Sequence, residues 1–370
     1  METLNATCLC GTAKLEITQQ FANLPLETFI CHCDSCRRMT GTLCLTAARL
    51  PRYEPASSLL AKLQAYDFSE NLRWYFCASC GTHMLVRITE DHDTQGGPVR
   101  WMVATGALEQ AETTLEVAAH EFIADTLDGG FSDFLQVIKN KPINRWSHTF
   151  HKSEILPHYW QSPVKPTVDT ASKERLHAHC KCNGVNFWIA RPSAQSTMGA
   201  ASWPDVIIPH TSTEPTPDDE VWWLCDGGKK YLAGICSCDS CRLASGMEWV
   251  EWAFVPTIDI TLDAEGKVPF SRNFGTLKSF RSTTRPATRY FCGSCGAIVY
   301  WTGDERPELI DVAVGLLDAA EGARAESWLE WETKRLSYRE DAMPRAESLT
   351  LAVEAGIKQY RKKFQPWKVG

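Results

Sequence analysis

The hydrophobic pattern of the chain is mostly that of short strands. Runs rich in β-branched or aromatic residues recur between breaks made by Gly, Pro or Asp, which is typical of β-structure. These runs are residues 13–18, 74–76, 84–88, 101–104, 185–190, 249–255 and 298–301. Helical periodicity is scarce, and its best examples are residues 133–139 and 346–363. We therefore predict a mainly β protein with few short helices, a C-terminal helix, and knuckle-like turns that present its cysteines.

The cysteines fall into clusters that occur twice in the same order. All but two of the 16 cysteines, Cys44 and Cys225, belong to a Cys-x-Cys pair, a Cys-x-Cys-x-x-Cys group or a Cys-x-x-Cys pair. In the first half the clusters are Cys8 and Cys10, then Cys31, Cys33 and Cys36, then Cys77 and Cys80. In the second half they are Cys180 and Cys182, then Cys236, Cys238 and Cys241, then Cys292 and Cys295. Matching flanks, such as Tyr-Phe before Cys77 and Cys292, indicate an internal duplication.

The boundary between the two copies is expected where prolines gather among polar residues. Pro157, Pro163 and Pro166 stand in such a segment, whose composition suits an extended linker. We predict a first unit at residues 1–160, a linker at 161–175 and a second unit at 176–370. The second unit carries two inserts, residues 202–235 and about 259–272. Both are placed where they could cover or reshape a site at the middle cluster, or could be plain surface loops.

The grouping of cysteines predicts two kinds of zinc site in each unit. The two outer pairs of a unit can meet across a sheet and offer four thiolates, which is a closed, structural zinc set. The middle group supplies three thiolates and leaves one tetrahedral position for water or substrate, as catalytic zinc sites do. We therefore predict four Zn²⁺ per chain, two structural and two open.

Other interpretations of the cysteines remain to be weighed. Paired disulfides would leave one thiol over in each unit, and an iron–sulfur cluster would lack a fourth local cysteine in the middle group. His32 could close the first middle site as a fourth ligand, but Ser237 takes its place in the second copy. Zinc therefore remains the preferred interpretation.

The bulk composition limits the class of protein. The chain has 370 residues and a net charge of −7, which argues against a nucleic-acid-wrapping protein. No apolar run is long enough for a membrane span, and residues 1–10 lack a basic region followed by an apolar stretch. We expect a cytoplasmic protein without nucleic-acid or membrane partners, in which clustered cysteines hold metal.

These motifs resemble the glutathione-dependent formaldehyde-activating enzyme family, also called the centromere protein V family. Its pattern is Cys-x-Cys-Gly, Cys-x-Cys-x-x-Cys-Arg with a nearby Gly, Phe-Cys-x-x-Cys-Gly, and a Gly-x-Leu-Asp strand end. Both copies show it, over nearly the whole chain. The resemblance implies Mss4-like β units, two zinc ions per unit, and carbon–sulfur lyase chemistry on glutathione adducts.

The two copies depart from this pattern in different ways. The first copy keeps Gly11 and the His120 strand but ends the last motif in Glu109, whereas the second keeps Asp318 and has Asn183 in place of the glycine. We therefore expect unequal roles for the two units, which we predict to pack together as an intramolecular pseudo-dimer.

Two functional hypotheses follow from the sequence. The first is a zinc-dependent carbon–sulfur lyase acting on a glutathione or other thiol adduct, or a related activated small molecule, at the open sites. The candidates for proton transfer or substrate binding beside the cysteines are Asp34, Arg37, Asp239 and Arg242. The second hypothesis is a non-catalytic, zinc-stabilised binding or scaffold protein. Trp222, Trp223, Trp249 and Trp252 are the tryptophans to inspect for a pocket.

Overall fold

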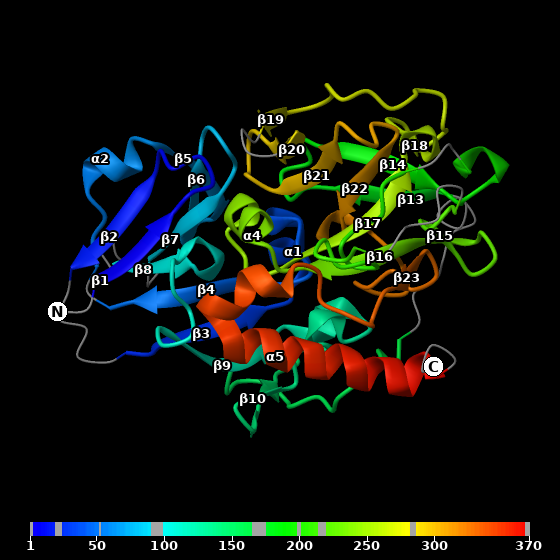
Figure 1. Cartoon of the computed structure of the whole chain (residues 1–370). Helices are drawn as coiled ribbons and strands as arrows, with labels where there is room; N and C mark the ends of the chain where they lie inside the picture. The colour runs from blue at the N-terminus through cyan, green and yellow to red at the C-terminus, as the bar shows by residue number, and fades with distance from the viewer. Residues whose placement is uncertain are drawn as a thin grey trace.

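The computed structural model describes residues 3–18, 24–51, 53–89, 99–164, 175–197, 201–213, 220–281 and 286–366. Most of the predicted linker, residues 165–174, lies outside the described residues, as does the 214–219 part of the first predicted insert. Figure 1 shows two sheet-rich halves with a long C-terminal helix beneath them. The prediction of a mainly β protein is confirmed.

The first half is built on one large sheet. Its strand order is β12 (Asn144–Arg145), β9 (Leu115–Glu121), β3 (Leu26–Cys31), β4 (Leu45–Leu50), β8 (Val99–Ala104), β7 (His83–Thr89), β6 (Leu72–Cys77) and β5 (Leu63–Ser69). Two short hairpins accompany it, β1 (Thr3–Thr7) with β2 (Lys14–Thr18), and β10 (Val137–Ile138) with β11 (Lys141–Pro142). The helices are α1 (Asp34–Thr40) and α2 (Ser57–Leu60), and 3₁₀ turns η1 (Thr105–Ala107), η2 (Ile123–Thr126) and η3 (Gly130–Asp133) complete the half.

The second half repeats this topology. Its sheet runs β15 (Leu224–Cys225), β16 (Lys230–Cys236), β17 (Val250–Pro256), β22 (Leu309–Ala313), β21 (Ile298–Gly303), β20 (Ala287–Cys292) and β19 (Leu277–Arg281). β23 (Leu329–Trp331) lies parallel to β16, as β9 lies parallel to β3. A separate sheet contains β13 (Arg175–His179), β14 (Asn186–Ala190) and β18 (Ile260–Thr261). The half also contains α4 (Asp239–Ser245), α5 (Arg339–Phe364) and the 3₁₀ turns η4 (Ala194–Ser196), η5 (Thr257–Asp259) and η6 (Val314–Leu316).

The predicted strands are all present, but the helices differ from expectation. The helix predicted at 346–363 lies within α5, which begins earlier. The helix predicted at 133–139 is wrong. Residues 137–138 form β10, and positive φ angles at Lys139 and Asn140 turn the chain into β11. The apolar spacing that suggested a helix comes instead from Phe134 and Leu135, which are buried in the core.

Two short helices appear where the sequence predicted only turns. α1 and α4 follow the middle cysteine groups, and the Sγ atom of Cys33 or Cys238 caps each helix by accepting a hydrogen bond from a backbone N–H at 3.3 Å. Each helix ends at a glycine with a left-handed conformation, Gly41 or Gly246. Thus the cysteine group and the glycine of the repeated motif are the two ends of one local structure.

The motif glycines also bring the two halves together. The N–H of Gly106 in η1 donates to the carbonyl of Gly246 at 2.9 Å, and the N–H of Gly315 in η6 donates to the carbonyl of Gly41 at 3.0 Å. A β-carbon on Gly41 would lie 2.1 Å from the Ile298 carbonyl oxygen, and one on Gly246 would lie 2.2 Å from that of His83. Only glycine permits this approach, so corresponding residues of the two copies meet reciprocally.

The Phe-Cys-x-x-Cys-Gly motifs form a second reciprocal contact. A β-carbon on Gly81 would meet the ring of Phe291 at 2.6 Å, and one on Gly296 would meet the ring of Phe76 at 2.7 Å. Each motif therefore packs its glycine on the phenylalanine of the other copy. The largest apolar cluster accordingly contains residues of both halves.

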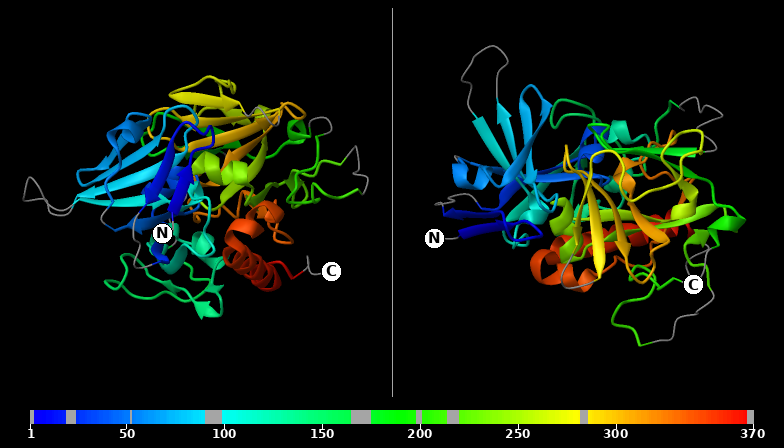
Figure 2. Two further views of the ribbon diagram at one scale, coloured as in Figure 1. Left: turned by 60° about the vertical axis from the view of Figure 1, so that its left-hand side comes forward. Right: turned by 90° about the horizontal axis from the view of Figure 1, so that it is seen from above.

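The C-terminal helix crosses from the second half to the first. Arg345 in α5 accepts hydrogen bonds at its carbonyl from the N–H groups of Ala111 and Glu112, at 3.1 and 2.8 Å. Gly356 lies against the backbone of Phe134, where a β-carbon would be 2.1 Å from the carbonyl oxygen. Both views in Figure 2 show α5, in red, beside the sheets. The helix thus joins the two halves.

Candidate metal centres and their cavities

The outer cysteine pairs of each half meet in one four-sulfur group. In the first half the turn after β1 brings Cys8 and Cys10 to Cys77 and Cys80, and in the second half Cys180 and Cys182 meet Cys292 and Cys295. The sulfurs of Cys10 and Cys77 are 3.6 Å apart, and those of Cys182 and Cys292 are 3.4 Å apart. Tetrahedral bonds of about 2.3 Å would separate the sulfurs by about 3.8 Å, so these groups fit a zinc ion closely.

The middle cysteines form a three-sulfur group in each half. Cys31 ends β3, while Cys33 and Cys36 lie at the start of α1; Cys236, Cys238 and Cys241 repeat the arrangement at β16 and α4. Among the described residues, these groups have three members each and no fourth ligand. All of the cysteines are free thiols, so the disulfide interpretation does not apply. The second group is buried, whereas the first is half-buried.

His32 is engaged away from the first three-sulfur group. Its Nε2 lies 2.9 Å from Nδ1 of His120, and Nε2 of His120 lies 2.7 Å from the Leu135 carbonyl oxygen. Burial lowers the pKa of both histidines, that of His120 to about 3, so the pair is neutral. In the second copy the Ser237 hydroxyl donates to the Ser337 carbonyl at 2.8 Å. The residue between the first two cysteines therefore anchors the turn in both copies.

The thiols of a three-sulfur group share their charge unequally. Hydrogen bonds from Cys31 and Cys36 lower the pKa of Cys33 to about 3. The hydrogen bonds within the group, together with burial, raise the pKa of Cys31 and Cys36 well above the usual value. The group thus holds one thiolate and two thiols in the absence of a cation. A bound metal would displace the remaining protons, so its affinity must rise with pH.

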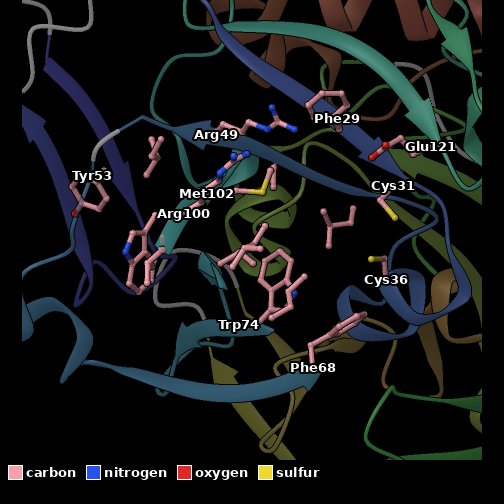
Figure 3. Close-up of a pocket in the computed structure, with 18 of the residues that line it drawn as sticks. Phe29, Cys31, Cys36, Arg49, Tyr53, Phe68, Trp74, Arg100, Met102 and Glu121 are labelled. Atoms are coloured by element: carbon pink, nitrogen blue, oxygen red, sulfur yellow. The ribbon is translucent and has the colours of Figure 1, made fainter. Parts of the chain in front are cut away.

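A cavity of about 600 Å³ leads to the first three-sulfur group (Figure 3). Cys31 and Cys36 lie at one end and Tyr53 at the other, with Trp74 and Met102 between them. The walls are mostly apolar, and the charged lining residues are Arg49, Arg100 and Glu121. This cavity can enclose an apolar group next to the sulfurs.

A smaller cavity of about 370 Å³ leads to the second three-sulfur group. All three cysteines line it, together with Trp252, Arg289 and Trp301. Residues 202–206 of the first predicted insert also line it, so of the two possibilities for this insert the structure favours one that reaches the cavity. Among the described residues, none of the second insert lines the cavity; its strand β18 instead pairs with β14.

The two cavities occupy the same place in their sheets. In each half, four residues paired across neighbouring strands form a row on the cavity wall. In the first half the row is Arg49, Met102, Val86 and Trp74. In the second half it is Phe254, Asp311, Trp301 and Arg289. Equal register therefore makes Arg289 the counterpart of Trp74, and Asp311 that of Met102.

The sequence-predicted charged candidates lie outside these walls. Arg37 donates to Asp34 at 2.5 Å, and Arg242 donates to Asp239 at 2.7 Å, within their helices. Arg242 also donates to the carbonyl of Gly106 in the other half at 2.7 Å. None of these four residues is part of the described lining of either cavity, and their catalytic role stays a prediction.

Sequence reasoning missed the residues that do face the cavities. Glu121 and Arg289 were not singled out, although alignment of the two Tyr-Phe-Cys motifs would have set Arg289 opposite Trp74. Of the four tryptophans that were candidates for lining a pocket, Trp252 lines the second cavity. Trp222 and Trp223 pack in a separate apolar cluster, and Trp249 stacks on Phe131.

Fold and sites together define a duplicated β protein with four cysteine clusters able to bind metal. The sequence profile described as glutathione-dependent formaldehyde-activating enzyme matches residues 3–125 and 220–332, which is more than half of the chain. The chain belongs to this family. The second match begins at residue 220, after Cys180 and Cys182. These two cysteines are assigned to the second unit because the structure brings them to Cys292 and Cys295.

Two curated fungal proteins are similar to part of the chain. Both are named "Putative glutathione-dependent formaldehyde-activating enzyme". The protein of Podospora anserina is 28% identical over 125 residues, covering 34% of this chain and 56% of the relative. That of Penicillium rubens is 29% identical over 90 residues, covering 24% and 46%. The chain thus spans about half the length of these relatives. No solved structure matches the chain. Within its described residues, no helix has the length and apolar character needed to cross a membrane.

Proposed function

We propose that this chain is a zinc-dependent enzyme of the carbon–sulfur lyase type, acting on an adduct of glutathione or of another small thiol. The observation that carries the proposal is the three-sulfur group at the inner end of a cavity in each half. A purely structural metal would not need an approach for a small molecule. The names of the two fungal relatives point to the same substrate class.

The donor sets support zinc. Thiolates are soft ligands that suit Zn²⁺, and the four-sulfur groups have the compact spacing of a closed site. We assign four zinc ions per chain: structural zinc to the four-sulfur groups, and open zinc to Cys31, Cys33 and Cys36 and to Cys236, Cys238 and Cys241. Zinc bound at an open group supplies Lewis acidity and a coordination position for a thiolate or carbonyl.

The residues of the chain supply the remaining functions. The apolar walls around Trp74 and Met102 exclude water from the first group and hold the substrate's organic part. Glu121 lies on this wall and is paired in the β3–β9 register with Cys31. Its pKa is raised by burial, and its Oε1 accepts a hydrogen bond from the Phe150 N–H at 2.8 Å. This carboxyl is therefore the group placed to hold or pass a proton in the first cavity.

We further infer that the units 1–160 and 176–370, joined by the linker 161–175, work as an intramolecular pseudo-dimer. The reciprocal glycine contacts support this arrangement, because corresponding motifs of both copies make the same interactions across one interface. The interface also touches the helices that begin at the three-sulfur groups. Docking of the units would thus hold both cavities in shape.

X-ray absorption at the zinc edge tests the proposal directly. The native protein should contain four zinc ions, with an average of between three and four sulfurs per zinc. Adding a small thiol should raise that average towards four, because the thiol occupies the open positions. Activity on a panel of glutathione thioadducts should then depend on Cys33 or Cys238. An average of four sulfurs without added thiol, with no activity on any thioadduct, would instead support a scaffold protein.

A further inference from the structure

Arg289 is a buried arginine that pairs with no carboxylate of the described residues, although its charge acts on the thiols of Cys238 and Cys241. Its side chain is 6% exposed and lines the second cavity with the three cysteines. Its Nε is buried without a hydrogen-bond partner, and its guanidinium makes no ion pair with the described residues. Burying a guanidinium without a carboxylate partner is unfavourable, because no ion pair replaces its lost hydration. Such a group is most stable when a ligand completes its environment.

Arg306 and two of the carboxyl groups that line this cavity are already paired. Arg306 donates to both carboxylate oxygens of Asp311, at 2.7 and 3.0 Å. Asp205 accepts from Arg335 at 2.9 Å and from the backbone N–H of Tyr338. These pairs neutralise themselves. Glu305 and Asp341 also line the cavity, and Glu305 lies 3.8 Å from Arg306, so among the described residues Arg289 is the lining arginine that pairs with no carboxylate.

A counter-charge role towards the thiolates does not by itself explain this arginine. The pKa of Cys241 is lowered well below its usual value, first by hydrogen bonds from Cys236 and Cys238, and further by the charge of Arg289. Yet the first unit has the same three cysteines, and Trp74 occupies the position of Arg289. The sulfur group therefore does not require a cation there, and the difference concerns what enters the cavity.

We propose that Arg289 binds the carboxylate of a small anionic ligand in the second cavity. A guanidinium offers a planar pair of donors that matches a carboxylate. Trp252 and Trp301 line the space beside it, and about 370 Å³ accommodates a small molecule. The second unit is thereby specific for an anionic thiol or thioadduct. Binding of the ligand's thiol rests on the proposed open zinc site, whereas binding of its carboxylate by Arg289 does not.

Calorimetric binding to the zinc-loaded full chain tests the proposal with three probes. Mercaptoacetate carries a thiol and a carboxylate, 2-mercaptoethanol is its neutral match, and acetate has the carboxylate alone. One site of the native protein should prefer mercaptoacetate over 2-mercaptoethanol by about tenfold or more, as expected for a hydrogen-bonded charge pair. Arg289→Met should abolish that preference without changing 2-mercaptoethanol binding, and Arg289→Lys should restore part of it.

Arg281→Met is the matched control. Arg281 is exposed and pairs with Asp304 at 2.6 Å, so its loss alters net charge equally without touching the cavity. The preference should survive this substitution. Zinc content is measured in every variant.

Each result separates the two proposals. Unchanged preference in Arg289→Met would overturn the role of Arg289, while thiol binding would still support the open zinc site. Loss of zinc in Arg289→Met with carboxylate preference retained would assign the arginine to the thiolates instead. If acetate binds in a way that depends on Arg289 and neither thiol binds, the role of Arg289 is supported and the proposal of an open zinc site is contradicted. No binding of mercaptoacetate or acetate would overturn the inference.

Discussion

The two cavities share a backbone and differ in their inward-facing side chains. Trp74 and Met102 give the first cavity an apolar wall, whereas Arg289 and Asp311 stand at the same register positions in the second. The cysteines, the capping glycines and the strand order are common to both. Metal ligands and close glycine contacts tolerate little change, but a cavity wall can change while the fold is kept. The two units therefore share their metal-ligand frame and differ in the side chains that a ligand would meet.

A second difference lies beside the sulfurs. The N–H of His32 donates to the Glu121 carbonyl at 3.0 Å, and the N–H of Ser237 donates to the Ser337 carbonyl at the same distance. These matching bonds make Ser337 the counterpart of Glu121. At this position the first cavity thus has a carboxyl where the second has a hydroxyl.

The largest effect should come from removing a closed site. Cys292→Ser should destabilise the protein severely, because structural zinc contributes about 10–16 kcal/mol in small zinc peptides. Cys238→Ser should leave the melting temperature nearly unchanged and remove about one zinc ion. Calorimetry measures the melting temperature, and elemental analysis measures the zinc content. Cys225→Ser is the control, because Cys225 lies outside every cysteine cluster. Equal losses of stability would erase the distinction between four-sulfur and three-sulfur groups.

Proton transfer should separate the two units next. Glu121→Gln should lower kcat on an apolar thioadduct by about 10²–10⁴-fold, the usual contribution of a general acid or base. The zinc content should not change. Ser337→Ala is the matched substitution in the second unit and should leave that activity intact. The opposite result, with only Ser337→Ala impaired, would place the working site in the second unit.

The interface between the units can be tested at one glycine. Gly246→Ala should destabilise the protein by about 1–3 kcal/mol more than Gly227→Ala does, since its β-carbon would strike the His83 carbonyl. Gly227 also has positive φ but nothing within 4 Å, so it reports the cost of backbone conformation alone. Chemical denaturation gives both values. Similar losses would mean that the halves do not depend on this contact.

The last expected difference is in the pH dependence of metal binding at the first three-sulfur group. The raised pKa of Cys31 and Cys36 means that these thiols are protonated at neutral pH without metal. Binding a cation releases their protons, so affinity should fall by about tenfold per pH unit for each proton released as pH decreases. A chromophoric zinc chelator added between pH 8 and 5 should empty the three-sulfur sites before the four-sulfur sites. Release of all sites together would contradict two classes of site.

Much of this protein can be understood from its sequence alone. The duplication, the division of cysteines into four plus three, and the main strands follow from local spacing, because ligand motifs and β-runs are written in neighbouring residues. The C-terminal helix was likewise visible in its apolar periodicity. The failed helix at 133–139 shows the limit of such patterns. There the apolar spacing arose from tertiary burial of Phe134 and Leu135, while left-handed residues at 139 and 140 made a hairpin.

The tertiary structure alone decided what faces the cysteines. A cavity wall combines side chains from four strands, and their register depends on pairings between residues far apart in the chain. Arg289 and Glu121 could not be chosen from many charged residues without that register. The partners of Gly41 and Gly246 were equally invisible, because each lies in the other copy. Sequence spacing determined which chemistry the chain carries, and long-range packing determined which side chains meet it.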